Sequence, residues 1–179
     1  MFRIISMILA LTLLSFPIYA ESWYRLVLYD EISIEVPKNS DHKVIDLKNE
    51  AYLSTVDGCS FMIGIVKGAF DNRGNYLSWS EEERVNNTLS LFEGILQGKL
   101  TRGNQQLISK KAFQTGKYIG MDIVYRTKAS SDPDSRKRFV TFIAIENTLY
   151  MFECWYMDGK DHTKEKEKFF GSMRTKYRH

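Results

Sequence analysis

Residues 136–157, RKRFVTFIAIENTLYMFECWYM, decide the fold of this chain of 179 residues. Two β-rich runs, 136–146 and 149–157, are separated by the short polar pair Asn147-Thr148, a spacing typical of a β-hairpin. In both runs the apolar residues fall on both alternating faces. A strand that is apolar on both faces is typical of the centre of a sheet that is covered above and below. The segment therefore predicts two neighbouring central strands with a packed layer on each side.

Further strands are expected on both sides of this hairpin in the sequence, and most of them are joined by short turns. Asp57-Gly58 joins two of them, and this dipeptide tolerates the positive φ that a tight hairpin turn needs. Pro37 closes an early strand, and a polar loop is expected over residues 38–43. The expected strands are residues 23–29, 32–36, 51–56, 59–66, 107–114 and 118–127. Short connections between neighbouring strands imply antiparallel pairing.

Two helices are expected, one between the two groups of strands and one near the end of the chain. Ser80 and Glu83 have the spacing of a capping box, which marks the start of the first helix. The apolar stripe of this helix comprises Val85, Leu89, Phe92 and Leu96.

The second helix is expected over residues 163–177, with Asp161 as its cap. Its apolar stripe comprises Phe169, Phe170, Met173 and Tyr177. The order of hairpins, helix, hairpins and helix predicts an α+β fold, in which an antiparallel β-sheet built from hairpins is flanked by two main helices.

Four segments, in this order, carry a resemblance to a known superfamily. They are Ile32-Ser33-Ile34-Glu35-Val36-Pro37, Gly120-Met121-Asp122-Ile123-Val124-Tyr125, the hairpin from Arg138 to Tyr156, and Lys168-Phe169-Phe170-Gly171-Ser172-Met173. In these segments the chain resembles the PsbP-like superfamily, which includes the extrinsic photosystem subunit and the Mog-type Ran-binding proteins. The resemblance implies an α/β/α sandwich and a binding or accessory role without a shared active site. It provides no catalytic residue to carry over, and the sequence shows no photosystem context.

The first 20 residues have the features of a cleavable signal peptide. One basic residue, Arg3, precedes a short apolar run, and the small residue Ala20 stands at the expected cleavage site. The run is shorter than the roughly 20 apolar residues that a membrane-spanning helix needs, and no later stretch is long enough. The bulky Ile18 is unusual near a cleavage site, which leaves an uncleaved anchor or a buried strand as alternatives. We expect residues 1–20 to be a signal peptide, residues 21–179 to form a single domain, and the mature protein to be periplasmic or secreted.

The charge balance gives no support to nucleic-acid binding. The sequence has 25 Lys and Arg residues against 22 Asp and Glu residues, and one of the basic residues lies in the expected signal peptide. Nucleic-acid-binding domains normally show a strong basic excess on one face. The basic residues Arg174, Lys176 and Arg178 are explained more simply by a solvated helix end, where positive charge complements the helix dipole, than by a phosphate-binding patch.

Both cysteines, Cys59 and Cys154, lie in the part of the chain that we expect to be exported. In an oxidising compartment two such cysteines predict a disulfide bond. The bond would close a loop of about 95 residues and stabilise the fold by roughly 4.5 kcal/mol in the chain-entropy model. Two separate buried thiols that pack as small apolar side chains are the alternative.

No metal-binding constellation stands out in the sequence. The three histidines, His42, His162 and His179, lack the spacing of metal ligands, and none adjoins a cysteine. Residues 71–75 resemble the start of a calcium loop, but the later oxygen ligands are missing and Arg73 places a positive charge within it. We therefore expect neither a metal nor a cofactor.

No catalytic motif stands out either. Gly58-Cys59-Ser60 and Gly171-Ser172 do not match the Gly-x-Ser-x-Gly elbow of a hydrolase. Cys59 with His162 remains as a pair that the fold would have to bring together from distant positions. We expect the protein not to be an enzyme.

The aromatic side chains suggest a contact surface. Aromatic rings are favoured where an apolar body meets a polar rim, as at a binding interface. Core filling and cross-strand pairing are the alternative role. The first candidates for contact with a partner are Trp155, Met157 and Trp79.

Taken together, these features favour an exported, non-enzymatic binding or accessory protein whose protein partner or small ligand the sequence does not identify. Two alternatives remain open. One is a small periplasmic hydrolase with a dispersed site. The other is a lipocalin-like carrier of an apolar ligand, which the hairpins would form by closing into a barrel. The expected helix after Ser80 counts against the barrel.

Overall fold

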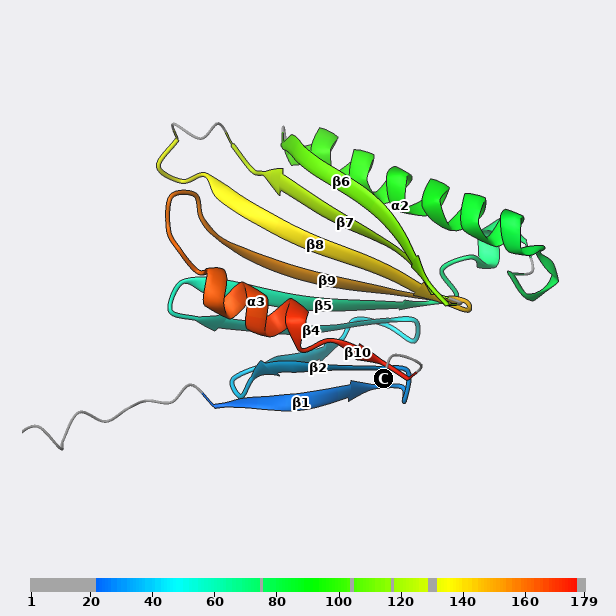
Figure 1. Cartoon of the computed structure of the whole chain (residues 1–179), viewed down its shortest axis with the longest axis horizontal. Coiled ribbons are helices and arrows are strands. Elements are labelled where there is room, and N and C mark those ends of the chain that lie inside the picture. The colour runs from blue at the N-terminus through cyan, green and yellow to red at the C-terminus, as the bar shows by residue number, and fades with distance from the viewer. Residues whose placement is uncertain (1–21, 75, 104, 117, 129–131, 177–179) are drawn as a thin grey trace, which may run out of the picture.

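The computed structural model describes residues 22–74, 76–103, 105–116, 118–128 and 132–176. These residues form a large antiparallel sheet, a small sheet and two α-helices (Figure 1). The expected signal peptide, residues 1–20, lies outside the described residues. Within the described part of the chain, no helix is long and apolar enough to cross a membrane.

The large sheet has seven strands in the order β3-β4-β5-β9-β8-β7-β6. Its strands are β3 (Asp41–Val44), β4 (Asn49–Val56), β5 (Cys59–Lys67), β6 (Gln106–Thr115), β7 (Tyr118–Arg126), β8 (Arg136–Ile145) and β9 (Thr148–Met157). The predicted central hairpin is β8 and β9, whose register pairs Thr141 with Phe152. Both faces of these two strands are largely buried, so the prediction of central strands is confirmed. The sheet ends at β3 and β6 and is open, unlike the closed barrel of a lipocalin-like carrier.

The prediction of a polar loop over residues 38–43 is wrong in part, because residues 41–44 form the edge strand β3. This strand pairs with β4 and places His42 opposite Tyr52. All four residues of β3 are exposed. Since no side chain of the strand is buried, it lacks the apolar alternation by which a strand is recognised in sequence.

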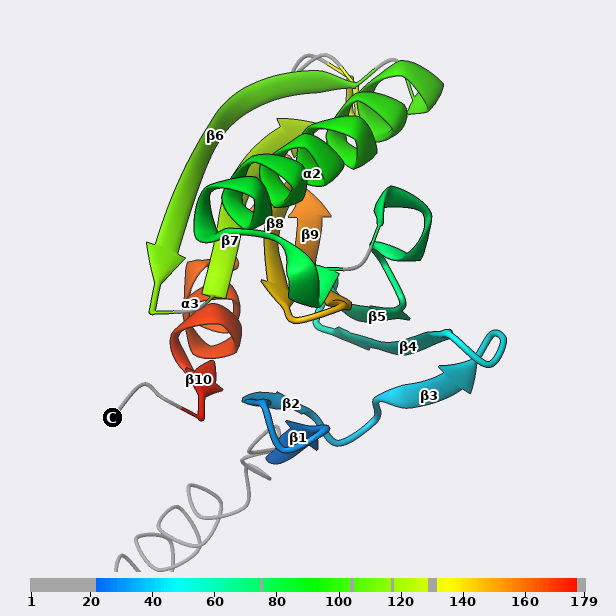
Figure 2. The same ribbon diagram turned by 90° about the vertical axis from the view of Figure 1, so that its right-hand side faces the viewer.

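Helix α2 (Glu81–Gly103) covers one face of the large sheet (Figure 2). The predicted capping box is present: the Glu83 backbone N–H donates to the Ser80 hydroxyl at 3.2 Å, and the Ser80 N–H donates to the Glu83 carboxylate at 2.8 Å. Phe92 is buried against Phe142 of β8, with 5.4 Å between the ring centroids. Two short 3₁₀ turns, η1 (Asp71–Arg73) and η2 (Tyr76–Ser78), lead into the helix.

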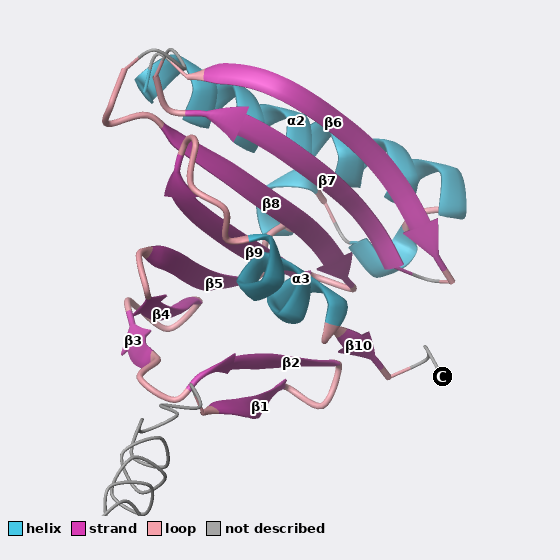
Figure 3. Cartoon of the chain, turned by 60° about the vertical axis from the view of Figure 1, so that its left-hand side comes forward, coloured by secondary structure: helices cyan, strands magenta, loops and turns pink. Residues whose placement is uncertain are grey.

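Helix α3 (Thr163–Gly171) lies on the opposite face, as Figure 3 shows. The N-cap residue is His162, which makes no side-chain capping bond, so the prediction of Asp161 as the cap is off by one residue; the Thr163 N–H nevertheless donates to the Asp161 carboxylate at 3.0 Å. Phe169 is fully buried and packs on Phe61 of β5, with 5.1 Å between the ring centroids. Helices on both faces of an antiparallel sheet confirm the predicted α+β fold.

The predicted extent of this last helix, to Tyr177, is wrong. Residues after Gly171 leave the helix and form β10 (Arg174–Thr175), which pairs with β2. Pairing with a neighbouring strand gives these backbone groups partners that a longer helix would otherwise supply. Arg174 therefore lies in a strand and not at a solvated helix end, while Tyr177 and Arg178 lie outside the described residues.

The small sheet has the order β1-β2-β10 and joins the two ends of the described chain. Strands β1 (Trp23–Leu28) and β2 (Ile32–Pro37) form the hairpin expected from the sequence, while the pairing of β10 with it was not predicted. The buried face of β2 comprises Ile32, Ile34 and Val36, which pack in one core cluster with Phe169.

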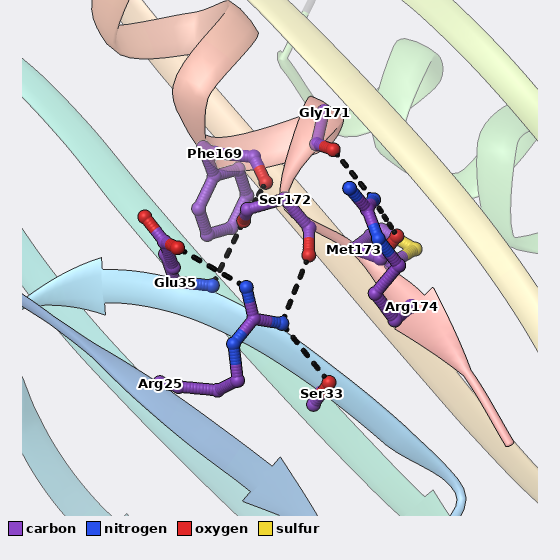
Figure 4. A network of polar contacts seen from close by, with 8 residues as sticks. All are labelled: Arg25, Ser33, Glu35, Phe169, Gly171, Ser172, Met173 and Arg174. Atoms are coloured by element: carbon purple, nitrogen blue, oxygen red, sulfur yellow. Dashed lines mark hydrogen bonds and ion pairs between the residues drawn. The ribbon is translucent and has the colours of Figure 1, made fainter. Parts of the chain in front are cut away.

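A polar network fastens this hairpin to the segment after α3 (Figure 4). The Arg25 guanidinium donates to the Ser33 hydroxyl at 3.1 Å and to the Ser172 carbonyl at 3.2 Å, and it pairs with Glu35 at 3.1 Å. The Ser172 hydroxyl accepts the Glu35 N–H at 2.8 Å and donates to the Phe169 carbonyl at 2.8 Å. The network holds the segment after α3 in place beside the large sheet.

Candidate functional site

A cavity of about 340 Å³ opens where α3 and β10 arch over strands β6 to β8. This volume falls within the roughly 300–1,000 Å³ of small-molecule sites. Described residues from β6, β7, β8 and the α3–β10 segment line it: Phe113, Thr115, Tyr118, Asp122, Thr141, Ile143, Phe170, Met173 and Thr175. We call it the β6–α3 pocket. The lining combines apolar and aromatic walls with a few polar groups, as ligand sites commonly do.

One wall depends on a close contact between a ring and a glycine. Phe113 and Gly120 are register partners on β6 and β7. A Cβ atom placed on Gly120 would lie 2.1 Å from Cζ of Phe113. Only a glycine lets the ring lie so close to the β7 backbone, a packing that also covers the glycine.

The polar groups of the pocket centre on one carboxylate. Asp122 of β7 accepts a hydrogen bond of 2.7 Å from the Thr141 hydroxyl of β8, its register partner. No described residue forms an ion pair with Asp122. Across the pocket, the Oγ1 of Thr175 is hidden from solvent and has no hydrogen-bond partner among the described residues.

A second hollow, of about 650 Å³, lies beside η1 and the turn between β8 and β9. Of the two carboxylates that line it, Asp71 and Glu146, Asp71 already accepts hydrogen bonds from Lys48 at 2.6 Å and from Asn147 at 2.7 Å. These contacts lower the pKa of Asp71, the Lys48 bond most of all. Because its polar groups are engaged within the protein, this hollow is the weaker candidate for a ligand.

A buried charge cluster on the α2 face was not predicted from the sequence. Glu153 of β9 is fully buried, pairs with Lys99 of α2 at 2.9 Å and with Arg138 of β8, and accepts a 3.1 Å hydrogen bond from Tyr125. Burial acts to raise the pKa of Glu153, but the charges of Lys99 and Arg138 outweigh it and lower the pKa. Burial, followed by the charge of Glu153, raises the pKa of Tyr125. An acidic residue in an otherwise apolar central strand was the only sequence signal for this cluster.

The structure separates the residues proposed for partner contact. Trp155 and Met157 lie two apart on β9 and are half-buried, and the Arg138 guanidinium lies 4.7 Å from the Trp155 ring centroid. Trp79 packs instead near the start of α2, with its ring centroid 5.8 Å from that of Phe70. Trp79 and Trp155 thus have different neighbours, and none of the three lines the β6–α3 pocket.

The two cysteines meet in the core beneath α3. Cys59 and Cys154 are free and fully buried, with their sulfur atoms 3.4 Å apart. This separation exceeds the roughly 2.05 Å of a disulfide bond. The hydrogen bond to Cys59, followed by burial, raises the pKa of the Cys154 thiol. Buried thiols with a raised pKa are poor nucleophiles.

The described histidines take part in local contacts. His42 stacks on Tyr52, with 4.3 Å between ring centroids, and its Nε2 lies 3.2 Å from Glu50. His162 lies near the turn before Cys59, and its Nδ1 is 3.7 Å from Glu165. His179 is outside the described residues. Among the described residues, no group of three or more His, Cys, Asp or Glu side chains is placed to hold a metal ion.

The sequence matches no protein-family model and no curated protein. Solved structures resemble the fold at low sequence identity. PsbP (CyanoP) from Synechocystis sp. PCC 6803 aligns with a TM-score of 0.54 and 10 % identity over 89 % of this chain and 95 % of that chain. The predicted PsbP-like sandwich is therefore confirmed as a fold.

Two further structures are similar at lower scores. The Saccharomyces cerevisiae Ran-binding protein Mog1p aligns with a TM-score of 0.44 and 9 % identity over 88 % of this chain and 97 % of that chain. A protein of unknown function from Pseudomonas aeruginosa aligns with a TM-score of 0.39 and 9 % identity over 75 % of this chain and 83 % of that chain. At such identities the similarity concerns the fold and not the function.

Proposed function

We propose that this chain is an exported, non-enzymatic binding protein that holds a small ligand in the β6–α3 pocket. The observation that carries the proposal is the pocket itself: an open hollow of about 340 Å³ lined by aromatic and aliphatic side chains together with a carboxylate and hydroxyls. This combination is typical of sites that bind and orient a small molecule.

The chemistry of the lining supports binding over catalysis. Among its described lining residues, the pocket has one carboxylate, Asp122, and no histidine, cysteine or lysine. General acid–base catalysis by carboxylates needs a pair of groups whose environments separate their pKa values. The thiols of Cys59 and Cys154 are buried elsewhere and are not lining residues. The hydrolase alternative therefore has no group of residues in this pocket to support it.

The mobility of the segment that closes the pocket is limited by the Arg25–Ser172 network. Ser172 receives hydrogen bonds from both strands of the N-terminal hairpin and follows α3 directly. A wall that is held before the ligand arrives reduces the ordering cost of binding. The network therefore supports a preformed site.

The test is a titration of the ¹⁵N-labelled protein, residues 21–179, with a matched set of small compounds. The compounds share apolar bodies (2-phenylethyl, cyclohexylethyl and hexyl), and each body carries an ammonium, hydroxyl or carboxylate group. We expect members of the set to shift the backbone amide signals of Phe113, Asp122 and Thr141 in a saturable manner. If no compound shifts these signals, the proposed function is refuted.

A blocking variant shows whether the shifts arise from the pocket. Met173→Trp places a large ring in the pocket wall and is expected to abolish binding. Met62→Trp makes the same chemical change at a half-buried site that does not line the pocket, and it is expected to retain binding. Binding that survives Met173→Trp, in a variant that keeps the native spectrum, contradicts the proposal.

A further inference from the structure

The β6–α3 pocket has a negative group and no compensating positive group among its described lining residues. Asp122 is the one charged residue of that lining. Lys111 lies opposite Asp122 in the β6–β7 register, but it does not line the cavity and forms no ion pair with Asp122. The Thr141 hydroxyl donates one hydrogen bond to the carboxylate. A carboxylate has about four acceptor positions, so Asp122 retains capacity for a donor in the pocket.

The aromatic walls also favour a positively charged ligand. Phe113 and Phe170 line the cavity from β6 and α3. The face of an aromatic ring attracts a cation through its quadrupole. Neither ring lies under a lysine or arginine among the described cation–ring contacts, which use Tyr29, Phe139, Trp155 and Trp23 instead.

The size and chemistry of the pocket favour an organic cation over a metal ion. A metal ion would need several oxygen, nitrogen or sulfur ligands in defined geometry. The described lining provides one carboxylate with threonine hydroxyls, and no metal-binding cluster occurs among the described residues. The apolar side chains of Ile143 and Met173 instead offer contact to a hydrocarbon body.

We infer that the ligand is a small organic cation, an ammonium group on an apolar or aromatic body, with its charge on Asp122 and its body between Phe113 and Phe170. This inference rests on the proposed function and adds the class of ligand. An ammonium group both donates to Asp122 and offsets its charge, whereas an alcohol only donates and a carboxylate is repelled, so the site favours cations over neutral and anionic ligands.

The matched compound set tests the inference separately from the function. With wild-type protein we expect each ammonium compound to bind about tenfold more tightly than the alcohol on the same body, and the carboxylates to bind weakest. If alcohols or carboxylates bind in the pocket as tightly as the ammonium compounds, the binding function stands and the cation class is wrong. If no compound binds, the function itself is wrong.

Two charge variants test whether the preference for ammonium compounds over alcohols arises at Asp122. Asp122→Asn keeps the size of the side chain and an oxygen that accepts from Thr141, and we expect it to lose the tenfold preference while the alcohols still bind. Asp134→Asn removes the same charge from an exposed loop residue outside the lining, and we expect the preference to remain. Equal loss in both variants, or retention in Asp122→Asn, overturns the inference, because the preference would then not arise at Asp122.

Discussion

The contact between Gly120 and Phe113 makes a prediction whose sign can be worked out. A Cβ on Gly120 would lie 2.1, 2.5 and 2.7 Å from three atoms of the Phe113 ring. Ordinary carbon contacts begin near 3.5 Å, so the ring must move by on the order of 1 Å in Gly120→Ala. Overpacking of this kind costs about 1–3 kcal/mol. Alanine is favoured over glycine in a strand by about 0.5–1 kcal/mol, so we expect a net loss of up to about 2.5 kcal/mol in the free energy of unfolding.

In a protein that lacks the Phe113 ring, we expect Gly120→Ala to stabilise the fold and not to destabilise it. All three of the nearest atoms belong to Phe113. In a Phe113→Ala protein the added methyl group therefore has space, and Gly120 is not among the residues with positive φ. We expect Gly120→Ala to stabilise that background by about 0.5 kcal/mol, because the unfolded chain loses conformational freedom.

The assay is equilibrium unfolding in urea for the four proteins of this double-mutant cycle, with similar slopes required for the comparison. Gly98→Ala is the control, since a Cβ there meets no atom within 4 Å in α2. It should stabilise the protein by up to about 1 kcal/mol. Equal destabilisation by Gly120→Ala with and without the Phe113 ring refutes the steric argument.

Four further predictions concern stability and processing. Glu153→Ala is expected to cost about 3–5 kcal/mol, because it leaves two cations beside an empty buried site. Because the pKa of Glu153 is lower in the folded protein than its ordinary value of 4.5, its contribution is present at neutral pH and is lost as the pH falls from that value through the lower folded pKa. Glu153→Gln should flatten this part of the acid-unfolding curve, and an unchanged curve contradicts the assignment. Ser80→Ala is expected to cost about 1 kcal/mol in urea unfolding through loss of the capping box, whereas a cost below the error of the measurement speaks against the cap. Under oxidising conditions Cys59 and Cys154 are expected to form a disulfide, so the non-reduced protein should be lighter than the reduced protein by two hydrogen atoms; equal masses would show free thiols. When the full chain is expressed in a Gram-negative host, the periplasmic protein is expected to begin at Glu21, and a cytoplasmic protein that retains Met1 would exclude export.

Local patterns predicted most of the large sheet and the start of α2. The alternation in residues 136–157 shows the burial of both faces, and the Ser80–Glu83 spacing describes contacts between neighbours in sequence. Such features depend on residues a few positions apart, which a sequence displays directly. The edge strand β3 was missed because its exposed side chains show no alternation.

The pairing of β10 and the pocket could not be predicted in the same way. Strand β10 has two residues, and its partner β2 lies about 140 residues earlier in the chain. Asp122 is an exposed residue of β7, as its place in the sequence pattern suggests, and only the arch of α3 makes it part of a cavity lining. The ring of Phe113 fits over Gly120 because two strands are in register, which no local pattern specifies.

The small sheet can form fully only when both ends of the described chain are present, because it joins β2 with β10. Its central strand, β2, is made early in synthesis, whereas β10 is among the last described residues to emerge. The hydrogen bonds that the Arg25 side chain and the Glu35 backbone N–H donate to Ser172 likewise form only after Ser172 has been made. The core beneath the hairpin therefore stays unfinished until nearly the whole chain is available in one place. For an exported chain, as proposed here, this arrangement delays final folding until the C-terminal strand is present in the same compartment as the N-terminal hairpin.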